Sequence, residues 1–286
     1  MKIGFIGLGI MGSRMAANLL TENVDLVVYN RTNGKTKPLA EQGAQVAQTM
    51  ADFADVDILF TMLAHPEAIT AVSQTENGFL NYLRPNTLWI DCSTVTPSFS
   101  RQMAAAAQAH NIHFLDAPVA GTKPHAANKE LTFIVGGLVE DVEKATPYFN
   151  MMGQRIAHVG GHGMGSSLKV VVNALLASSM ATFAEMMVLG QSLGLAQETL
   201  LNVLVGGPVV PPFMGMKRNN IEENNFDDPD FPLQWMHKDL HMATLAAYET
   251  AVPAPITQAA KELYAQAMQN GYSEQDFSAI YQFLNQ

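Results

Sequence analysis

The stretch KIGFIGLGIMGSRMAANLL, residues 2–20, decides the fold of the first half of the chain. It opens with Ile3, Phe5 and Ile6, which are typical of a buried strand, and it closes with a run that has the composition of a helix. The glycines between them follow the spacing G-x-G-x-x-G. A strand, a glycine-rich turn and a helix in this order predict the first unit of a doubly wound α/β domain that binds a dinucleotide.

Each glycine of this turn has its own physical role in dinucleotide binding. Gly7 allows the tight turn, Gly9 lets backbone N–H groups approach the pyrophosphate, and Gly12 lets the helix pack closely on the strand. The first turn of the helix adds the positive end of its dipole. A glycine turn without a ligand is the alternative. We predict a cofactor site formed by Gly7, Leu8, Gly9, Ile10, Met11 and Gly12.

The end of the second predicted strand, DLVVYN (residues 25–30), indicates which dinucleotide is bound. A cofactor with a free ribose 2′-hydroxyl favours Asp or Glu at this point, but this chain has Asn30 followed by Arg31 and Thr32. A guanidinium suits a 2′-phosphate, whereas a carboxylate would repel it. The sequence therefore favours NADP(H) over NAD(H). The alternative is that Arg31 is only a solvated turn residue.

Strands and helices continue to alternate through the first half of the chain. This pattern predicts a mostly parallel sheet with helices on both faces. The further predicted strands are residues 56–63, 87–95, 113–121 and 131–137. Ligands of such sheets bind beyond the carboxyl ends of the strands. We therefore expect one rim near the cofactor to contain Met62, Leu63, Ser93, Thr94, Ala120, Gly121 and Thr122.

Strand patterns end at a glycine-rich segment, GHGMGSS (residues 161–167), which we interpret as a hinge. The later predicted helices are residues 166–195, 234–247, 253–271 and 274–284. We expect two domains: a Rossmann-type NADP-binding domain over residues 1–161, and an all-α domain for substrate binding and dimerisation over residues 162–286. The long helix that joins them is expected to lie between the domains, where ligand clefts are common.

One charged residue, Lys169, lies in the apolar run SSLKVVVNALLASSM (residues 166–180). Lys169 and Asn173 are four residues apart, so they share a helix face, and Ser166 lies near that face. A buried ammonium needs a partner or a function. Helix position alone leaves two alternatives: a lysine that extends its charged end into solvent, or a functional lysine at the interdomain cleft.

Composition limits the classes of partner. The chain of 286 residues has a formal net charge of −10, which argues against binding to nucleic acid or to an anionic membrane. The only cysteine is Cys92, and no signal-peptide pattern opens the chain, so we expect a cytoplasmic protein.

Polar residues interrupt the apolar run 168–190, which favours a buried helix over a membrane span. His65, His113 and His125 lack ligand spacing, and we predict no metal.

Five motifs, in order along nearly the whole chain, resemble those of one family. They are GFIGLGIMGSRMAANLL, DCSTVTP, DAPVAGTKPHAANKELTFIVGG, GHGMGSSLKVVVNALL and FPLQWMHKDLHMA. Together they are similar to the cofactor fingerprint, the D-x-S-T-V loop, the substrate loop, the lysine helix and the late K-D-L segment of the β-hydroxyacid dehydrogenases. That family includes 3-hydroxyisobutyrate dehydrogenase, tartronate semialdehyde reductase and glyoxylate/succinic semialdehyde reductase.

The resemblance implies roles for individual residues. Lys169 would be the catalytic lysine, and Asn173 would support it and help to bind substrate. Thr94 and Lys238 would contact the cofactor. Their places at or after the ends of the predicted strands lead us to expect cofactor contacts from Asn30, Arg31, Thr32, Met62 and Leu63 as well. The substrate would contact Ala120, Gly121, Thr122, Phe231 and Asp239 as well as the catalytic pair. Relatives often have Ser at position 120, so the loss of that hydroxyl leaves one hydrogen bond to the substrate carboxylate in question, which Thr122 could supply.

Within the family, the pattern FDDPDFPLQWMHKDLHMA followed by GYSEQDFSAIYQFL most resembles the glyoxylate/succinic semialdehyde reductases. The expected reaction is hydride transfer from NADPH to the aldehyde of a small carboxylate, with Lys169 polarising the carbonyl as general acid. The alternatives are a 3-hydroxyisobutyrate dehydrogenase or a tartronate semialdehyde reductase. An imine reductase or a non-catalytic NADP-binding protein agrees less well with Lys169 beside Asn173. A homo-oligomer, dimer or tetramer, is expected.

Overall fold

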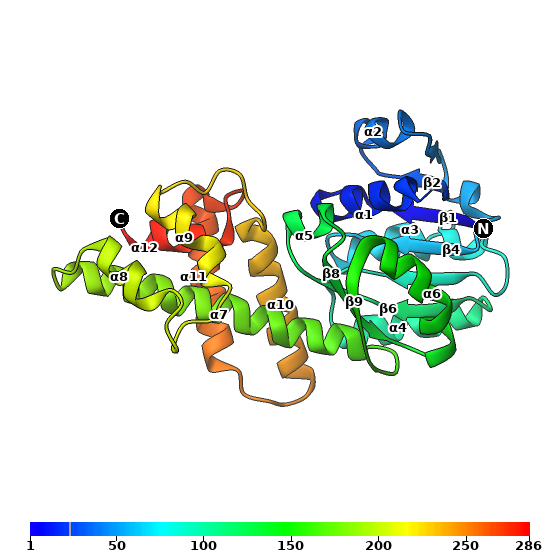
Figure 1. Cartoon of the computed structure of the whole chain (residues 1–286). Helices are drawn as coiled ribbons and strands as arrows, with labels where there is room; N and C mark the ends of the chain where they lie inside the picture. Colours follow the sequence, from blue (N-terminus) through cyan, green and yellow to red (C-terminus); the bar gives the residue numbers. More distant parts are fainter. Residues whose placement is uncertain (23) are drawn as a thin grey trace. The chain divides into compact units, whose positions relative to one another are not determined.

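The computed structural model describes residues 1–22 and 24–286, which form two compact units, Met1–Lys169 and Val170–Gln286. We describe each unit by itself. Unit 1 contains a mixed, largely parallel sheet with a Rossmann-like arrangement, and unit 2 is helical (Figure 1). The predicted fold class, an α/β nucleotide-binding domain followed by an all-α domain, is therefore confirmed.

The sheet of unit 1 has the order β3-β2-β1-β4-β5-β6-β8-β7, and β9 pairs with β8. The strands are β1 (Lys2–Ile6), β2 (Asp25–Tyr29), β3 (Gln45–Val46), β4 (Ile58–Thr61), β5 (Leu88–Asp91), β6 (His113–Asp116), β7 (Val119–Ala120), β8 (Leu131–Gly136) and β9 (Gly153–Gly160). The six strands from β3 to β6 in this order are parallel, so β1, β4 and β5 end at one common edge. That edge carries the glycine turn.

The other side of the sheet differs from the prediction in two respects. Residues 113–121, predicted as one strand, form β6 and β7 with Ala117 and Pro118 between them, and β8 runs antiparallel to both. Strand β9 was not predicted. Its residues are mostly partly or fully exposed, so the segment shows neither an apolar run nor a regular alternation.

Both faces of the sheet are covered, as the alternation of strands and helices predicts. Neighbouring residues of one strand enter different cores: Phe60 of β4 belongs to one buried cluster with Phe5, and Leu59 belongs to another with Trp89. The helical segments of this unit are α1 (Ile10–Thr21), η1 (Asn33–Lys35), α2 (Lys37–Ala40), η2 (Met50–Phe53), α3 (Pro66–Ser73), η3 (Phe79–Asn81), α4 (Pro97–Ala109), α5 (Lys123–Ala127) and α6 (Val139–Met152).

Unit 2 packs around one apolar cluster. Helix α7 (Met164–Ser192) begins in unit 1 and continues into unit 2, where Met180 and Met187 enter a core with Met236, Leu240 and Tyr264. The other helical segments are α8 (Gln197–Leu204), α9 (Met214–Glu222), α10 (Leu233–Glu249), α11 (Pro255–Ala267), η4 (Met268–Tyr272), η5 (Phe277–Ala279) and α12 (Ile280–Leu284). Helices α8 and α9 were not predicted, because α8 is short and α9 is polar with little apolar periodicity.

The predicted hinge over residues 161–167 is too long. Residues 164–167 form the first turn of α7, so only Gly161, His162 and Gly163 remain outside a regular element. By length and composition alone, α7 could cross a membrane, and 44% of its most apolar stretch is buried inside the protein. The core helix of a globular domain has these same properties.

Candidate active site

The glycine turn between β1 and α1 has the geometry that dinucleotide binding requires. Gly7 has φ of 101°, and a Cβ there would lie 2.2 Å from the carbonyl oxygen of Met62. A Cβ on Gly12 would lie 2.0 Å from the carbonyl oxygen of Gly7, whereas a Cβ on Gly9 would meet nothing within 4 Å. The turn is therefore closed on the protein side and open at Gly9, beside the N-terminus of α1, where a pyrophosphate fits.

Asn30 braces this turn. Its Oδ1 accepts a hydrogen bond from the backbone N–H of Leu8 at 2.9 Å, and its Nδ2 donates to the carbonyl oxygen of Thr32 at 3.1 Å. The side chains that follow, Arg31 and Thr32, are exposed just past the end of β2. Both remain available to a ligand at this edge, while Asn30 holds the turn in shape. Ile10 and Met11 are partly buried in the first turn of α1.

A buried carboxylate, Asp91, organises the next part of the edge. Its Oδ1 accepts hydrogen bonds from the hydroxyls of Thr61 at 2.8 Å and Ser93 at 2.6 Å. The Ser93 hydroxyl oxygen in turn accepts from the backbone N–H of Leu63 at 2.9 Å. The predicted rim residues after β4 and β5 are thus linked through Asp91, which sequence reasoning did not assign. Its signal was an acidic residue at the end of an otherwise apolar strand.

The start of α7 is fixed to the sheet of unit 1 by a second buried carboxylate, Asp116. Its Oδ1 accepts from the backbone N–H of Gly163 at 2.7 Å, and its Oδ2 accepts from that of Ser166 at 2.8 Å. The Ser166 hydroxyl also bonds the Ser100 hydroxyl at 2.7 Å. A Cβ on Gly165 would lie 2.4 Å from the carbonyl oxygen of Ile134, so the backbones touch here.

This anchoring determines where Lys169 lies. Lys169 follows Ser166 by three residues on the same helix, and it is 8% exposed. A lysine that extends its ammonium into solvent would be far more exposed, so that alternative does not fit the structure. Helix α7 therefore presents a buried lysine at a position tied to the carboxyl end of β6.

Burial raises the pKa of Asp116 to about 6, despite the two backbone N–H groups that favour its charged form. A carboxyl whose pKa is raised on folding stabilises the fold most below its unfolded value of 3.8, and this contribution is lost as the pH rises through about 6. Over the full titration, the free energy of unfolding changes by about 3 kcal/mol, because the pKa of Asp116 is raised by roughly two units.

We expect the free energy of unfolding of unit 1, relative to that of Asp116→Asn, to fall by about 1 kcal/mol between about pH 5 and about pH 8. The side chain of Asn does not titrate, so the comparison isolates the Asp116 carboxyl. Urea unfolding followed by the fluorescence of the buried Trp89, in a Trp235→Phe background, measures it. A pH-independent difference would contradict the raised pKa.

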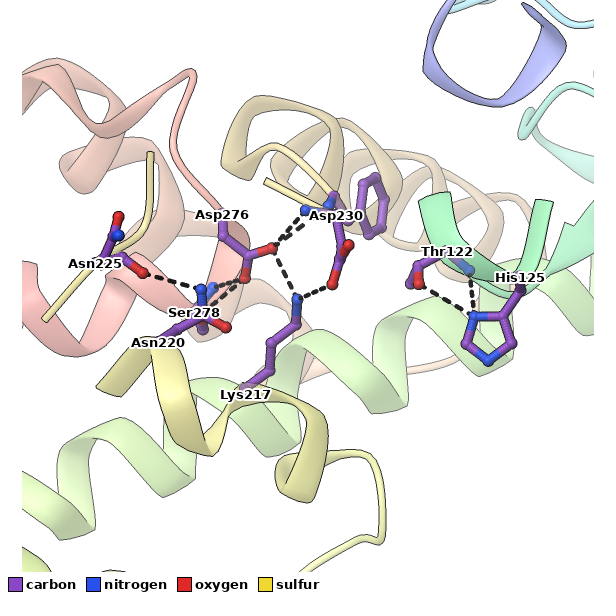
Figure 2. Close-up of polar contacts among 9 residues, drawn as sticks. Thr122, His125, Lys217, Asn220, Asn225, Asp230, Asp276 and Ser278 are labelled. Carbon is purple, nitrogen blue, oxygen red and sulfur yellow. Dashed lines mark hydrogen bonds and ion pairs between the residues drawn. The ribbon is translucent and has the colours of Figure 1, made fainter. Parts of the chain in front are cut away.

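The predicted substrate loop, Ala120–Gly121–Thr122, lies beyond β6, where Gly121 has φ of 125°. Figure 2 shows that Thr122 and His125 contact each other. The Thr122 backbone N–H donates to His125 Nδ1 at 3.2 Å, and the Thr122 hydroxyl lies 3.2 Å from the same nitrogen. These two groups of Thr122 can bind a substrate carboxylate only if their contacts with the His125 imidazole are broken. The T-x-x-H spacing of a capping box was the signal for His125.

Three predicted residues meet inside unit 2. Asn173 of α7 donates a hydrogen bond from Nδ2 to Oδ2 of Asp239, which is 2% exposed on α10. The ammonium of Lys238 lies 2.6 Å from Oδ1 of the same carboxylate. Asp239 therefore orients Asn173, one helical turn after Lys169, and is partly neutralised by Lys238. Phe231, just before α10, is partly buried with its ring 6.0 Å from that of Phe277.

Three histidines of unit 1 have structural contacts. His65 caps α3, His113 pairs with Asp141 at 2.9 Å, and His162 contacts the carbonyl oxygen of Phe114 at 3.0 Å. Glu185 is exposed on α7. Within residues 1–22 and 24–286, no three His, Cys, Asp or Glu side chains are grouped so that they could hold a metal ion.

Comparison with known proteins places these features in one family. Residues 2–160 match the NAD binding domain of 6-phosphogluconate dehydrogenase, and residues 163–284 match the NAD-binding family of NADP-dependent 3-hydroxyisobutyrate dehydrogenase. Glyoxylate/succinic semialdehyde reductase 2 of Arabidopsis thaliana is 35% identical over 99% of this chain and 79% of its own length. An NAD-dependent L-serine dehydrogenase of Pseudomonas aeruginosa is 36% identical over 98% of this chain and 96% of its own.

A solved structure agrees with both sequence matches. The 3-hydroxyisobutyrate dehydrogenase of Mycobacterium tuberculosis, determined with L-serine, has a TM-score of 0.88 and 31% identity, covering 100% of this chain and 99% of its own. These similarities extend over both units, and the motifs that carried the sequence resemblance lie within them. The chain therefore belongs to the β-hydroxyacid dehydrogenase family of NAD(P)-dependent oxidoreductases.

Proposed function

We propose that the chain is an NADPH-dependent reductase that transfers a hydride to the aldehyde of a small carboxylate such as glyoxylate or succinic semialdehyde. The observation that carries the proposal is the buried Lys169, held by the contacts of Asp116 and Ser166 at the carboxyl end of β6. The 35% identity to a glyoxylate/succinic semialdehyde reductase supports this substrate class.

Each of the proposed site residues has its own role in the reaction. NADPH, when bound, supplies the hydride. The Lys169 ammonium hydrogen-bonds the carbonyl oxygen, stabilises the negative charge that develops on it and then gives it a proton. Asn173, oriented by Asp239, helps to hold the substrate beside the lysine. The backbone N–H groups of residues 120–122 and the Thr122 hydroxyl bind the substrate carboxylate, and Thr94 and Lys238 contact the cofactor.

A panel of substrates tests this function. NADPH oxidation, followed by absorbance, is expected with glyoxylate or succinic semialdehyde and not with cyclic imines. A second candidate is the oxidation of a small β-hydroxyacid such as 3-hydroxyisobutyrate, which the 31% identity to the M. tuberculosis structure favours. Running both directions, each with the phosphorylated and the unphosphorylated cofactor, separates the two candidates. No turnover in any arm would contradict both.

We expect Arg31→Asp to lower the ratio of kcat/KM with NADPH to that with NADH by about 10- to 100-fold. The change removes a charged hydrogen bond to the 2′-phosphate and puts a carboxylate in its place, and each tenfold step corresponds to about 1.4 kcal/mol. Lys37→Ala is the matched control, because Lys37 is an exposed cation nearby on α2 whose ion pair is with Glu41. An unchanged cofactor ratio for Arg31→Asp would show that NADPH selectivity does not depend on this guanidinium.

We also propose that the chain forms a homo-oligomer, a dimer or a tetramer. Support comes from α7, where apolar side chains stay exposed along the helix: Met164, Leu168, Val171, Val172, Leu175, Met186 and Leu189. Exposed apolar patches of this kind mark interaction surfaces. The mass in solution from light scattering tests the proposal.

A further inference from the structure

Unit 2 contains a buried charged cluster that the proposed chemistry does not use. Lys217 of α9 is 2% exposed, and its Nζ lies 2.8 Å from Oδ2 of Asp276 and 3.2 Å from Oδ2 of Asp230 (Figure 2). Asp276 is fully buried. The ammonium also lies 5.2 Å from the centre of the Phe277 ring. We call Lys217, Asp230 and Asp276 the Lys217 cluster.

Asp276 uses both carboxylate oxygens to connect two distant segments. Its Oδ2 accepts from the backbone N–H groups of Asp230 at 3.1 Å and Phe231 at 3.4 Å. Its Oδ1 accepts from Ser278, through the backbone N–H at 3.1 Å and the hydroxyl at 2.6 Å. The Phe277 N–H donates back to the Phe231 carbonyl oxygen at 2.9 Å. Both polar groups of the Phe231 backbone, its N–H and its carbonyl oxygen, are therefore hydrogen-bonded to residues 276 and 277.

Stability alone is a weak reason for such a cluster. Taking a lysine and a carboxylate out of water has a high cost, and apolar side chains of similar volume often give an equally stable or a more stable fold. A buried charged group can instead serve to fix one geometry. The geometry fixed here is that of Phe231, which immediately precedes the segment leading into α10 with Lys238 and Asp239.

The cluster also controls charge next to Phe231. The Asp230 side chain is 31% exposed, whereas Lys217 and Asp276 are buried. Lys217 contributes one positive charge against two carboxylates, so without it two negative charges stand uncompensated beside Phe231. A substrate that carries a carboxylate would be repelled by them.

We propose that Lys217 is a positioning residue for substrate binding: it fixes Phe231 through Asp276 and screens Asp230, so that the chain accepts an anionic substrate. The inference rests on the proposed function, because it takes Phe231 as a residue that contacts the substrate. Lys217 acts through other residues and does not touch the reacting atoms.

The test compares an anionic with a neutral aldehyde, succinic semialdehyde with butanal, at saturating NADPH. In Lys217→Met we expect KM for succinic semialdehyde to rise by about 10- to 100-fold, and KM for butanal to rise less. We expect kcat to change by less than about threefold, because the reacting groups are untouched. Lys217→Arg keeps the charge and is expected to retain most of the wild-type preference for the anionic substrate.

Asp230→Asn provides a second, milder variant, because it keeps the ion pair of Lys217 with Asp276. We expect it to lower KM for succinic semialdehyde by about threefold at low salt and to leave KM for butanal unchanged. If Lys217→Met does not fold, as judged by circular dichroism, this variant decides the question. An unchanged preference between the two aldehydes in every folded variant would overturn the proposal. Wild-type protein that reduces no aldehyde would instead contradict the proposed function.

Discussion

Lys169→Ala is expected to reduce turnover by about 1,000-fold and to leave the dissociation constant for NADPH within about twofold of that of the wild type. The ammonium is the proposed proton donor and the group that stabilises the developing oxyanion. The glycine turn, Asn30 and Arg31, which are expected to bind the cofactor, are formed without it. Single-turnover kinetics with NADPH and succinic semialdehyde measure the chemical step, and fluorescence titration measures cofactor binding.

Two further variants separate the loss of charge from damage to the helix. Lys169→Met keeps most of the side-chain volume at this buried position but removes the ammonium, so we expect it to be as inactive as the alanine variant. Glu185→Ala changes an exposed residue of the same helix that belongs to none of the proposed binding surfaces, and it should keep near-normal turnover. Near-normal turnover in Lys169→Met would show that the lysine is not the proton donor.

The sequence predicted those parts of the site that depend on local backbone geometry. The glycine turn could be identified because Gly7 and Gly12 are the positions where a side chain would collide with backbone. Lys169 and Asn173 could be paired because helix periodicity puts residues four apart on one face. In both cases the informative residues lie within about a dozen positions of each other.

The contacts that position the site escaped prediction because they join residues far apart in the chain. Asp116 holds the start of α7 from 47 and 50 residues away, and Lys217 pairs with Asp276 across 59 residues. No periodicity signals such pairs. For Asp116, the indication in the sequence is an acidic residue at the end of an apolar strand. The contact of His125 with Thr122, in contrast, is local, and the sequence indicates it only through the capping-box spacing of the two residues.

Contacts between distant residues also explain why the hinge before α7 is predicted too long. The glycine-rich segment 161–167 predicts a hinge, because glycine is common in mobile turns. In the structure, Gly163 and Gly165 instead allow close packing: a Cβ on either would lie within 3 Å of a backbone oxygen. Glycine in a sequence can indicate mobility or tight contact, and only the neighbouring chain decides between them.

The glycine turn between β1 and α1 contains both kinds of glycine. Alanine substitutions at Gly9 and Gly12, three residues apart, are therefore expected to differ in their effect on stability. Gly12→Ala places a Cβ 2.0 Å from the carbonyl oxygen of Gly7, so α1 must move away from β1. The gain in helix propensity is about 1 kcal/mol, but overpacking against backbone costs about 1–3 kcal/mol or more. We expect a lower unfolding midpoint and weaker cofactor binding together, because the turn itself is displaced.

Gly9→Ala is the matched variant. Gly9 has φ of −75°, which alanine adopts without strain, and its added Cβ would meet nothing within 4 Å. We expect the unfolding midpoint to stay unchanged while the dissociation constant for NADPH rises by about 10- to 100-fold, because the methyl group stands where the pyrophosphate approaches the backbone. Thermal unfolding and fluorescence titration of both variants measure the two effects. If Gly9→Ala bound NADPH normally, the open side of the turn would not be the pyrophosphate site. If it lost stability as Gly12→Ala does, the space beside Gly9 would be needed by the fold and not by a ligand.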